Sequence, residues 1–420
     1  MTRFALIAVL LMTGCKIRNE QSCEIASNNC TDTDGGATCV INDDCVDPTR
    51  PICDAAGVCV ECIDNGECSG TSPVCNAGSC ERCVTDNQCP SEACLDDGAC
   101  ALPEDVIFAS ANGSDSGGCG LTSSDPCNLP RAISESTSTR NLIKLKAETF
   151  TSTGNEGFII DGDAVGHPVT FLARGAKIIH PTSGFSFTIK DGANVTLVGG
   201  TVEMGSGGLS CATASTLKVI GATVQSTTGL GIDSDACTLE VSRSTIHANF
   251  GGGIKIDTGT FVIIGNFIHG NGTASSLAGG VFIVVGENAA NRLEFNSLNT
   301  NFAMAGTGNG VNCAAGATFI ARNNIIFNNS YANNMIEANG CRYAFNDIGP
   351  MPVALALDAG DNINTNPLFV NQTSGDLHLQ SGTPLIDSAD PVAVITGAAA
   401  IDLDDDQRTL PTEMGADAVP

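Results

Sequence analysis

Four segments that follow one another along the chain decide its fold: TLVGGTVEM (residues 196–204), TLKVIGATVQ (216–225), TLEVSRSTIH (238–247) and TFVIIGNFIH (260–269). They align without gaps, and their matching aliphatic residues are spaced by 22 positions each time: Val202, Val224, Ile246 and Ile268. Weaker copies continue with steps of 30, 28 and 22, at Leu298, Ile326 and Ile348. A fixed period with strand-type alternation, glycine turns and asparagine clusters is typical of a solenoid of stacked coils.

This repeat predicts an all-β fold, a parallel β-helix whose inward aliphatic residues stack from coil to coil. Coils stack at the interstrand distance of about 4.8 Å, so eight or nine of them would form a rod of roughly 40 Å. A β-sandwich is the structural alternative, but it requires hairpin turns about every 8 to 12 residues. A sandwich gives no reason for three equal 22-residue intervals.

The residues before the repeat predict a cap. Val106 to Ser110 forms a strand pattern that runs into a turn at residues 112–115, and Leu142 to Leu145 returns to strand. Between them, Asn128 to Ser136 predicts a short helix with one apolar face, made of Leu129, Ala132 and Ile133. This order resembles the N-terminal cap of right-handed parallel β-helix proteins, in which a helix covers the open end of the apolar cylinder. The resemblance implies a right-handed β-helix with its cap over residues 105–350.

The tail carries a second resemblance. Residues 364–419 contain NPLFV, GDLHL, GTPLIDSAD, DLDDDQR and EMGAD. This series is similar to the closing segment of bacterial surface β-helix proteins of the choice-of-anchor kind, which implies that residues 351–420 close the β-helix. The sequence departs from the family pattern at Asp405-Asp406, where the family has Asp-Gly.

Cysteine is concentrated before the β-helix, since 14 of the 21 cysteines lie between Cys23 and Cys100. Units that open with Cys-x5-Cys begin at Cys39, Cys62 and Cys83, so residues 39–100 form a tandem array. Units of about 20 residues cannot bury a core, and two disulfides in each unit would replace one. Four cysteines allow three pairings, which the spacing leaves open.

Zinc is the alternative ligand of this array, because Cys59-x2-Cys62 and Cys80-x2-Cys83 each look like half of a zinc ribbon. Both pairs straddle unit junctions, and an exported chain enters an oxidising compartment that favours disulfides.

The remaining cysteines fit the β-helix. Cys211 and Cys237 lie 26 residues apart, and Cys313 and Cys341 lie 28 apart, which is about one coil in each case. We therefore expect each pair to join neighbouring coils. Cys119 and Cys127 are placed to close a small loop in the cap.

The N-terminus has the layout of a secretory signal peptide over residues 1–14, with Arg3, an apolar run and small residues before a cut. The residues Leu11-Met12-Thr13-Gly14-Cys15 resemble a bacterial lipobox, which implies a lipid on Cys15 and a linker over residues 15–38. Lys16 follows, not the Asp that retains such lipoproteins at the inner membrane, so the family rule implies the outer membrane or cell surface. An ordinary cleaved signal with a chance cysteine is the alternative.

The net charge of the chain limits the classes of partner that it can bind. The chain has 19 Lys and Arg against 46 Asp and Glu, a formal net charge of -27. Such a surface repels nucleic acid and anionic membranes. We expect no nucleic-acid partner, and contact with a membrane only through the N-terminal lipid.

The residue after each inward aliphatic residue is expected to point outward, and these residues form a row that we call the outward ladder: Glu203, Gln225, His247, His269, Asn299 and Phe327. Three interpretations stay open for it. The row is a solvated polar face, a stripe that contacts a glycan, or a metal or catalytic site built on the two adjacent histidines. On another face, Lys218 is expected beside Glu240 as an ordinary surface pair.

Enzymes with the fold that this chain resembles include pectate lyases and polygalacturonases, so fold alone names no reaction. The lyases need Ca²⁺ with a Lys or Arg near the substrate, and the polygalacturonases need clustered Asp; neither pattern stands out here. Asp402, Asp404 and Asp406 alternate as in a calcium loop, which makes structural Ca²⁺ possible there. The alternative is that these carboxylates pair with Arg408. No other cofactor is expected.

Together these features predict a non-enzymatic, lipid-anchored surface protein whose β-helix presents a recognition face to a polysaccharide or a surface protein. A polysaccharide lyase or glycoside hydrolase is the first alternative. A purely structural envelope spacer is the second.

Overall fold

The structure is a computed structural model. It describes residues 39–151, 157–180, 184–284, 288, 290–314, 319–329 and 335–417. The chain divides into two compact units, Met1–Pro103 and Glu104–Pro420. The predicted signal peptide (residues 1–14), the lipidation site Cys15 and the linker (15–38) lie outside the described residues. Within the described ranges, no helix is long and apolar enough to cross a membrane.

The first unit contains three cysteine-rich repeats with one shared disulfide pattern. In each repeat the first cysteine pairs with the third and the second with the fourth, which resolves the pairing that the spacing left open: Cys39–Cys53 and Cys45–Cys59, Cys62–Cys75 and Cys68–Cys80, Cys83–Cys94 and Cys89–Cys100. Every cysteine of both Cys-x2-Cys pairs is therefore in a disulfide, and the zinc alternative fails for these repeats.

Each repeat is a 3-10 turn followed by a short antiparallel pairing. The elements are η1 (Asn42–Asp44), β1 (Ile52–Cys53), β2 (Cys59–Val60), η2 (Asn65–Glu67), β3 (Val74–Asn76), β4 (Ser79–Glu81) and η3 (Asp86–Gln88). The side-chain oxygen three residues after the first cysteine accepts a hydrogen bond from the backbone N–H of the third cysteine, in Asn42, Asn65 and Asp86. This bond joins turn to strand in the same way in all three repeats.

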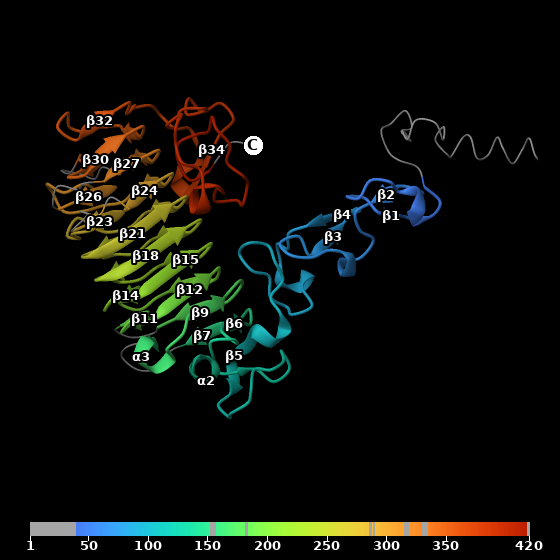
Figure 1. Cartoon of the computed structure of the whole chain (residues 1–420). Coiled ribbons are helices and arrows are strands. Elements are labelled where there is room, and N and C mark those ends of the chain that lie inside the picture. The colour runs from blue at the N-terminus through green and yellow to red at the C-terminus, as the bar shows by residue number, and fades with distance from the viewer. Residues whose placement is uncertain are drawn as a thin grey trace, which may run out of the picture. The chain divides into compact units, whose positions relative to one another are not determined.

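The second unit is a right-handed parallel β-helix made of three sheets (Figure 1). Sheet 1 contains β5 (Val106–Ser114), β6 (Leu142–Leu145), β9 (Val169–Leu172), β12 (Asn194–Val198), β15 (Thr216–Ile220), β18 (Cys237–Ser242), β21 (Gly259–Ile264), β24 (Arg292–Glu294), β27 (Ile320–Arg322), β30 (Arg342–Ala344) and β32 (Asp358–Gly360).

Sheet 2 contains β7 (Thr149–Thr151), β10 (Lys177–Ile179), β13 (Thr201–Glu203), β16 (Thr223–Gln225), β19 (Thr245–His247), β22 (Phe267–His269), β25 (Ser297–Asn299), β28 (Ile325–Phe327) and β31 (Asp347–Gly349). Sheet 3 contains β8 (Phe158–Asp161), β11 (Phe185–Lys190), β14 (Gly207–Cys211), β17 (Leu230–Ser234), β20 (Gly252–Ile256), β23 (Val281–Ile283), β26 (Val311–Cys313) and β29 (Ala338–Asn339). The chain visits the three sheets in this order once per coil.

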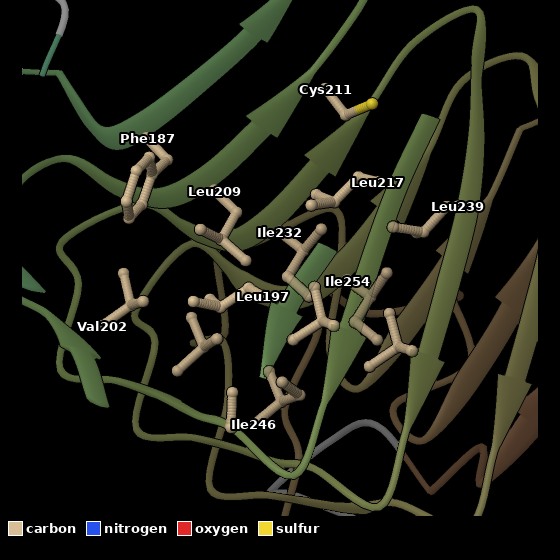
Figure 2. Close-up of a cluster of buried hydrophobic side chains, with 14 of the residues drawn as sticks. Phe187, Leu197, Val202, Leu209, Cys211, Leu217, Ile232, Leu239, Ile246 and Ile254 are labelled. Atoms are coloured by element: carbon tan, nitrogen blue, oxygen red, sulfur yellow. The ribbon is translucent and has the colours of Figure 1, made fainter. Parts of the chain in front are cut away.

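The 22-residue repeat of the sequence corresponds to the register in which strands of neighbouring coils pair. Val202 pairs with Val224, which pairs with Ile246, and the series continues through Ile268, Leu298, Ile326 and Ile348. All seven residues are buried in one apolar core. Figure 2 shows side chains of this core from all three sheets pointing inward, among them Leu197, Val202 and Ile232. Burial of these aliphatic residues from every coil is the main force that stabilises the cylinder.

Buried asparagines line two corners of the β-helix. One ladder runs through Asn249, Asn271, Asn301 and Asn329, and the other through Asn266, Asn296, Asn324, Asn346 and Asn362. Each amide donates to the side-chain oxygen of the next asparagine and to a backbone carbonyl, as Asn301 Nδ2 does to Ile268 O at 2.8 Å. The ladders satisfy backbone groups that the turns would otherwise bury without partners.

The N-terminal cap has the predicted helix, α2 (Leu129–Glu135), with Asn128 as its N-cap. Leu129, Ala132 and Ile133 are buried on the core side. The prediction that a turn begins at residue 112 is wrong. After the 3-10 turn η4 (Pro103–Asp105), β5 continues to Ser114, because Ser114 exchanges backbone hydrogen bonds with residues 126 and 128. A one-turn helix, α3 (Gly162–Val165), follows β8.

Three disulfides join parts of this unit. Cys119–Cys127 closes a loop of the cap. Cys211–Cys237 links β14 to β18, and Cys313–Cys341 links the last residue of β26 to the residue before β30, so each pair spans one coil as the spacing indicates. These bonds constrain the cylinder against uncoiling.

The C-terminal segment packs on the side of the last coils (Figure 1). It contains the antiparallel pair β33 (Phe369–Asn371) and β34 (Asp376–Leu379) and the 3-10 turns η5 (Gln372–Ser374) and η6 (Gly397–Ala399). A second apolar core joins this segment to outward residues of the β-helix, including Phe267, Phe295 and Ile325. The segment therefore covers part of the outer surface of sheets 1 and 2.

Candidate functional site

The outward ladder is a continuous row of aligned residues on sheet 2. Glu203 pairs with Gln225, Gln225 with His247, and His247 with His269. The row continues through Asn299 and Phe327. The strand register thus places the six residues on neighbouring strands, which are about 4.8 Å apart.

The C-terminal segment divides this ladder into two halves. Glu203, Gln225 and His247 are partly exposed, whereas Asn299 is fully buried. At His269, the segment approaches so closely that a Cβ added to Gly375 would lie 2.2 Å from the imidazole Cε1. The long open face expected from the sequence is therefore shortened, and Asn299 is in no position to meet a ligand from solvent.

The two aromatic side chains that stand beside the ladder are also covered. Phe267 is buried, with its ring 5.0 Å from that of His378 in the C-terminal segment. Phe327 is partly buried against the second apolar core. Phe267 therefore presents no free face for stacking on a sugar, and Phe327 is only partly exposed.

The open half of the ladder is held by polar contacts. Gln225 Nε2 donates to Glu203 Oε2 at 2.6 Å, and Lys177 Nζ donates to Glu203 Oε1 at 3.3 Å. The His247 and His269 rings stack with centroids 4.9 Å apart and planes tilted by 12°. Fixed side chains of this kind lose little rotamer entropy when a ligand binds.

The histidine pair is uncharged at neutral pH. Burial lowers the pKa of His247. Burial, with a smaller effect from the neighbouring imidazole, lowers the pKa of His269 to about 4. A neutral imidazole has one donor and one acceptor nitrogen, so the pair offers hydrogen bonds without charge.

A cleft of about 380 Å³ lies where the ladder meets the C-terminal segment. Its lining is uncharged and consists of His269, Gly270, Thr300, Asn328, Gln372, Thr373, Ser374 and Gly375. Amides, hydroxyls and backbone groups of this kind are hydrogen-bonding partners of sugar hydroxyls.

Two charged clusters lie on other faces. On sheet 3, Lys255 contacts Asp257 and lies 3.8 Å from Asp233 Oδ1, and burial raises the pKa of Asp233. The Lys255 ammonium is thus engaged by carboxylates of its own sheet. On sheet 1, Lys218 Nζ lies 2.9 Å from Glu240 Oε2. This is the surface pair that the alternation of inward and outward residues predicts.

A groove of about 660 Å³ lies between sheet 1 and residues 390–394. Its two guanidiniums already have carboxylate partners: Arg292 Nη2 lies 2.6 Å from Glu294 Oε2, and Arg322 Nη1 lies 3.0 Å from Asp390 Oδ2. The Arg322–Asp390 pair and a hydrogen bond from Arg292 Nη2 to Val394 O join the C-terminal segment to the β-helix.

The predicted calcium loop has a different geometry. Asp402 is buried, and its Oδ1 accepts hydrogen bonds from the backbone N–H groups of Asp404 and Asp406, at 3.0 and 2.9 Å. Its carboxylate therefore shapes the turn. Asp404 and Asp406 are both exposed, and Oδ2 of Asp404 lies 3.3 Å from Nε2 of His378. The three carboxylates do not converge on one ion.

Arg408 is the partner that the alternative interpretation gives to these acids. Arg408 is buried, its guanidinium lies 4.9 Å from the centre of the Phe295 ring, and Nη2 donates to Gly415 O. Burial lowers the pKa of Arg408, and the charges of Asp402, Asp417 and Glu413 oppose that effect.

The family model for a right-handed β-helix region matches residues 132–298, in agreement with the sheet topology. A pectate lyase crystal structure, Pel9A, is similar at 16% sequence identity with a TM-score of 0.49, and the match covers 74% of this chain and 95% of that one. None of the curated proteins matches this chain. A fold of this kind names no reaction or ligand.

Sequence reasoning missed two features of the site. The cover over His269 and Asn299 comes from residues about a hundred positions later, and no periodicity reports such a contact. The meeting of His378 with Asp376, Asp404 and Asp417 was also missed. The sequence signal was the histidine of GDLHL, two residues after an aspartate, in a tail otherwise poor in histidine.

Proposed function

We propose that the protein is a non-enzymatic surface protein that binds a glycan along the open half of the outward ladder. A lipid on Cys15 would hold it at the outer membrane or cell surface. The observation that carries the proposal is the open row Glu203, Gln225 and His247, which leads into an uncharged cleft beside His269.

Charge selects an uncharged glycan over an acidic one. A chain with a net charge of -27 repels uronate polymers. Lys177, a cation beside the open ladder, already contacts Glu203. The imidazole pair is neutral, so the face offers hydrogen bonds to hydroxyl groups and little attraction to carboxylates.

The same features count against lyase chemistry on this face. Elimination from a uronate needs a base near the substrate proton and a cation near its carboxylate. Among the described residues, the ladder brings no lysine, arginine or carboxylate cluster to His247, since Glu203 is two strands away. The tightest acid and lysine cluster lies on sheet 3, at Asp233, Lys255 and Asp257.

A pair of substitutions tests the proposed face. In His247→Ala and Gln225→Ala, a lost hydrogen bond of about 1.5 kcal/mol weakens glycan binding about tenfold. Thr238→Ala, an exposed change on sheet 1, serves as the control and leaves the Kd unchanged. Calorimetric titration with a glycan that the wild-type chain binds gives all three values. Equal affinities for the wild-type and ladder variants would rule out this face.

A further inference from the structure

Three side chains of the C-terminal segment converge on one point that the proposed glycan face does not use. They are His378 on β34, Asp404 in the turn that Asp402 shapes, and Asp417 near the end of the described chain. One ligand atom from each lies within 4.8 Å of the others. Nε2 of His378 is 3.3 Å from Oδ2 of Asp404.

The imidazole of His378 is held in an orientation that directs one of its nitrogens at Asp404. Its Nδ1 lies 2.5 Å from Oδ1 of Asp376, so the carboxylate fixes the ring and leaves Nε2 directed at Asp404. The edge contact with Phe267 restrains the ring from the β-helix side. A carboxylate that holds the second nitrogen of a histidine is the usual outer partner of a metal-bound imidazole.

The carboxylates are placed differently from one another. Asp417 is buried, and its Oδ2 accepts a hydrogen bond from Leu379 N–H at 3.1 Å, which fixes the group from the inner side. The Asp404 side chain is 54% exposed, so the point where the three meet opens to solvent. An ion therefore has an entry path on the side of Asp404.

Negative charge is in excess at this point. Asp376, Asp404 and Asp417 surround one imidazole. Arg408 is a nearby cation, but its charge also acts on Asp402 and Glu413, and Arg243 pairs with Asp405 in the same turn. A divalent cation would offset the remaining repulsion.

We propose that His378, Asp404 and Asp417 bind a divalent metal ion of the Zn²⁺ type and that Asp376 orients the histidine. Two ligands of a tetrahedral zinc ion, with bonds of about 2.1 Å, lie about 3.4 Å apart, close to the separation of His378 Nε2 and Asp404 Oδ2. Ca²⁺ fits less well, because it takes six to eight oxygen ligands, whereas this set supplies one nitrogen and two carboxylates. The ion joins β34, the turn at 402–406 and the C-terminal end of the described chain.

Zn²⁺ binding to the full chain tests this site. The protein is purified without reductant, so that the cysteines stay in disulfides, stripped with a chelator, and titrated with Zn²⁺ alone. We expect one tightly bound Zn²⁺ per chain by elemental analysis. His378→Ala and Asp404→Asn each weaken binding at least about tenfold, and Asp376→Asn weakens it by about 10- to 100-fold.

Asp406→Asn is the matched control, since it removes the same charge from the same turn but Asp406 is not among the three converging residues. It should leave Zn²⁺ affinity within about twofold, because an exposed charge that does not bind the ion directly acts weakly. Circular dichroism checks that each variant keeps its fold, and His378→Gln repeats the test with a side chain of similar size. The proposal is overturned if no zinc is retained, if Asp406→Asn weakens binding as much as Asp404→Asn, or if Ca²⁺ binds more tightly than Zn²⁺. None of these outcomes depends on glycan binding.

Discussion

Buried asparagines hold the corners of this β-helix at the scale of single residues. The sequence showed pairs such as Asn323-Asn324 and Asn328-Asn329, but it did not predict two ladders. The steps within the ladders vary with the length of the loops, from 22 to 30 residues between Asn249, Asn271 and Asn301. Only the hydrogen-bond pattern reveals that these residues occupy one corner. The inward aliphatic residues were predictable because burial repeats at every coil.

Asn301→Ala tests a ladder at its middle. The change leaves the N–H and amide of Asn271 without their acceptor at Asn301 Oδ1 and leaves Ile268 O without its donor. Each buried polar group without a partner costs about 1 to 3 kcal/mol, so we expect a loss of at least about 3 kcal/mol in the free energy of unfolding. Denaturant unfolding measures it, with Asn194→Ala on the surface as the control. A loss below about 1 kcal/mol would show that the ladder adds little.

A second single residue, Asp347, makes the free energy of unfolding depend on pH. It is fully buried, Thr365 N–H donates to its Oδ1 at 2.8 Å, and its Oδ2 has no hydrogen bond within the described structure. Burial raises its pKa to about 7. Between pH about 4 and 7 the unfolded chain has lost this proton and the folded chain keeps it, so stability falls as pH rises through that window. The slope is about 1.4 kcal/mol per pH unit.

The variant Asp347→Asn removes the titrating carboxyl group and with it this pH dependence of stability. Its stability relative to wild type should increase from pH 4 to pH 7 and then stay constant, which chemical denaturation at a series of pH values measures. Comparing the two proteins cancels the opposite contribution of His269, whose lowered pKa makes stability fall toward acid pH. A difference that does not change with pH would contradict the account of Asp347.

At the scale of elements, the C-terminal segment decides how much of the ladder is open. Its strands and turns were recognisable by resemblance in the sequence. Their position on the side of sheets 1 and 2 was not, because it rests on a second core between residues distant in the chain, such as Phe295 and Leu377. The disulfides Cys211–Cys237 and Cys313–Cys341 were easier to predict, since each spans one coil.

Phe295→Ala tests the attachment of this segment. Phe295 is fully buried, and Arg408 lies over its ring. Removal of a buried phenylalanine costs about 3 to 5 kcal/mol. We expect limited proteolysis to cut the variant between residues 365 and 417 while the coils stay intact. Phe250→Ala removes the same side chain from a 61% exposed position and should leave the segment protected. Equal protection in both variants would contradict this role of the second core.

At the scale of the whole molecule, a disulfide-rich array precedes a stiff cylinder whose polar side face is partly covered by the chain's own tail. The fold could be predicted from the sequence, because every coil of a solenoid repeats the same pattern of strands and inward-packing residues. The ladder's members and register followed as well. Its shortening by Gly375 and its neutral histidine pair did not, since both depend on burial by the tail.

The most direct measurement is a screen of the full chain against neutral and acidic glycans, with and without Ca²⁺, that records both bound protein and product. Product is detected by the ultraviolet absorbance of unsaturated sugars and by new reducing ends. The account predicts binding of an uncharged glycan without any product, and binding weakened about tenfold in His247→Ala. Formation of product, or binding of no glycan at all, would contradict it.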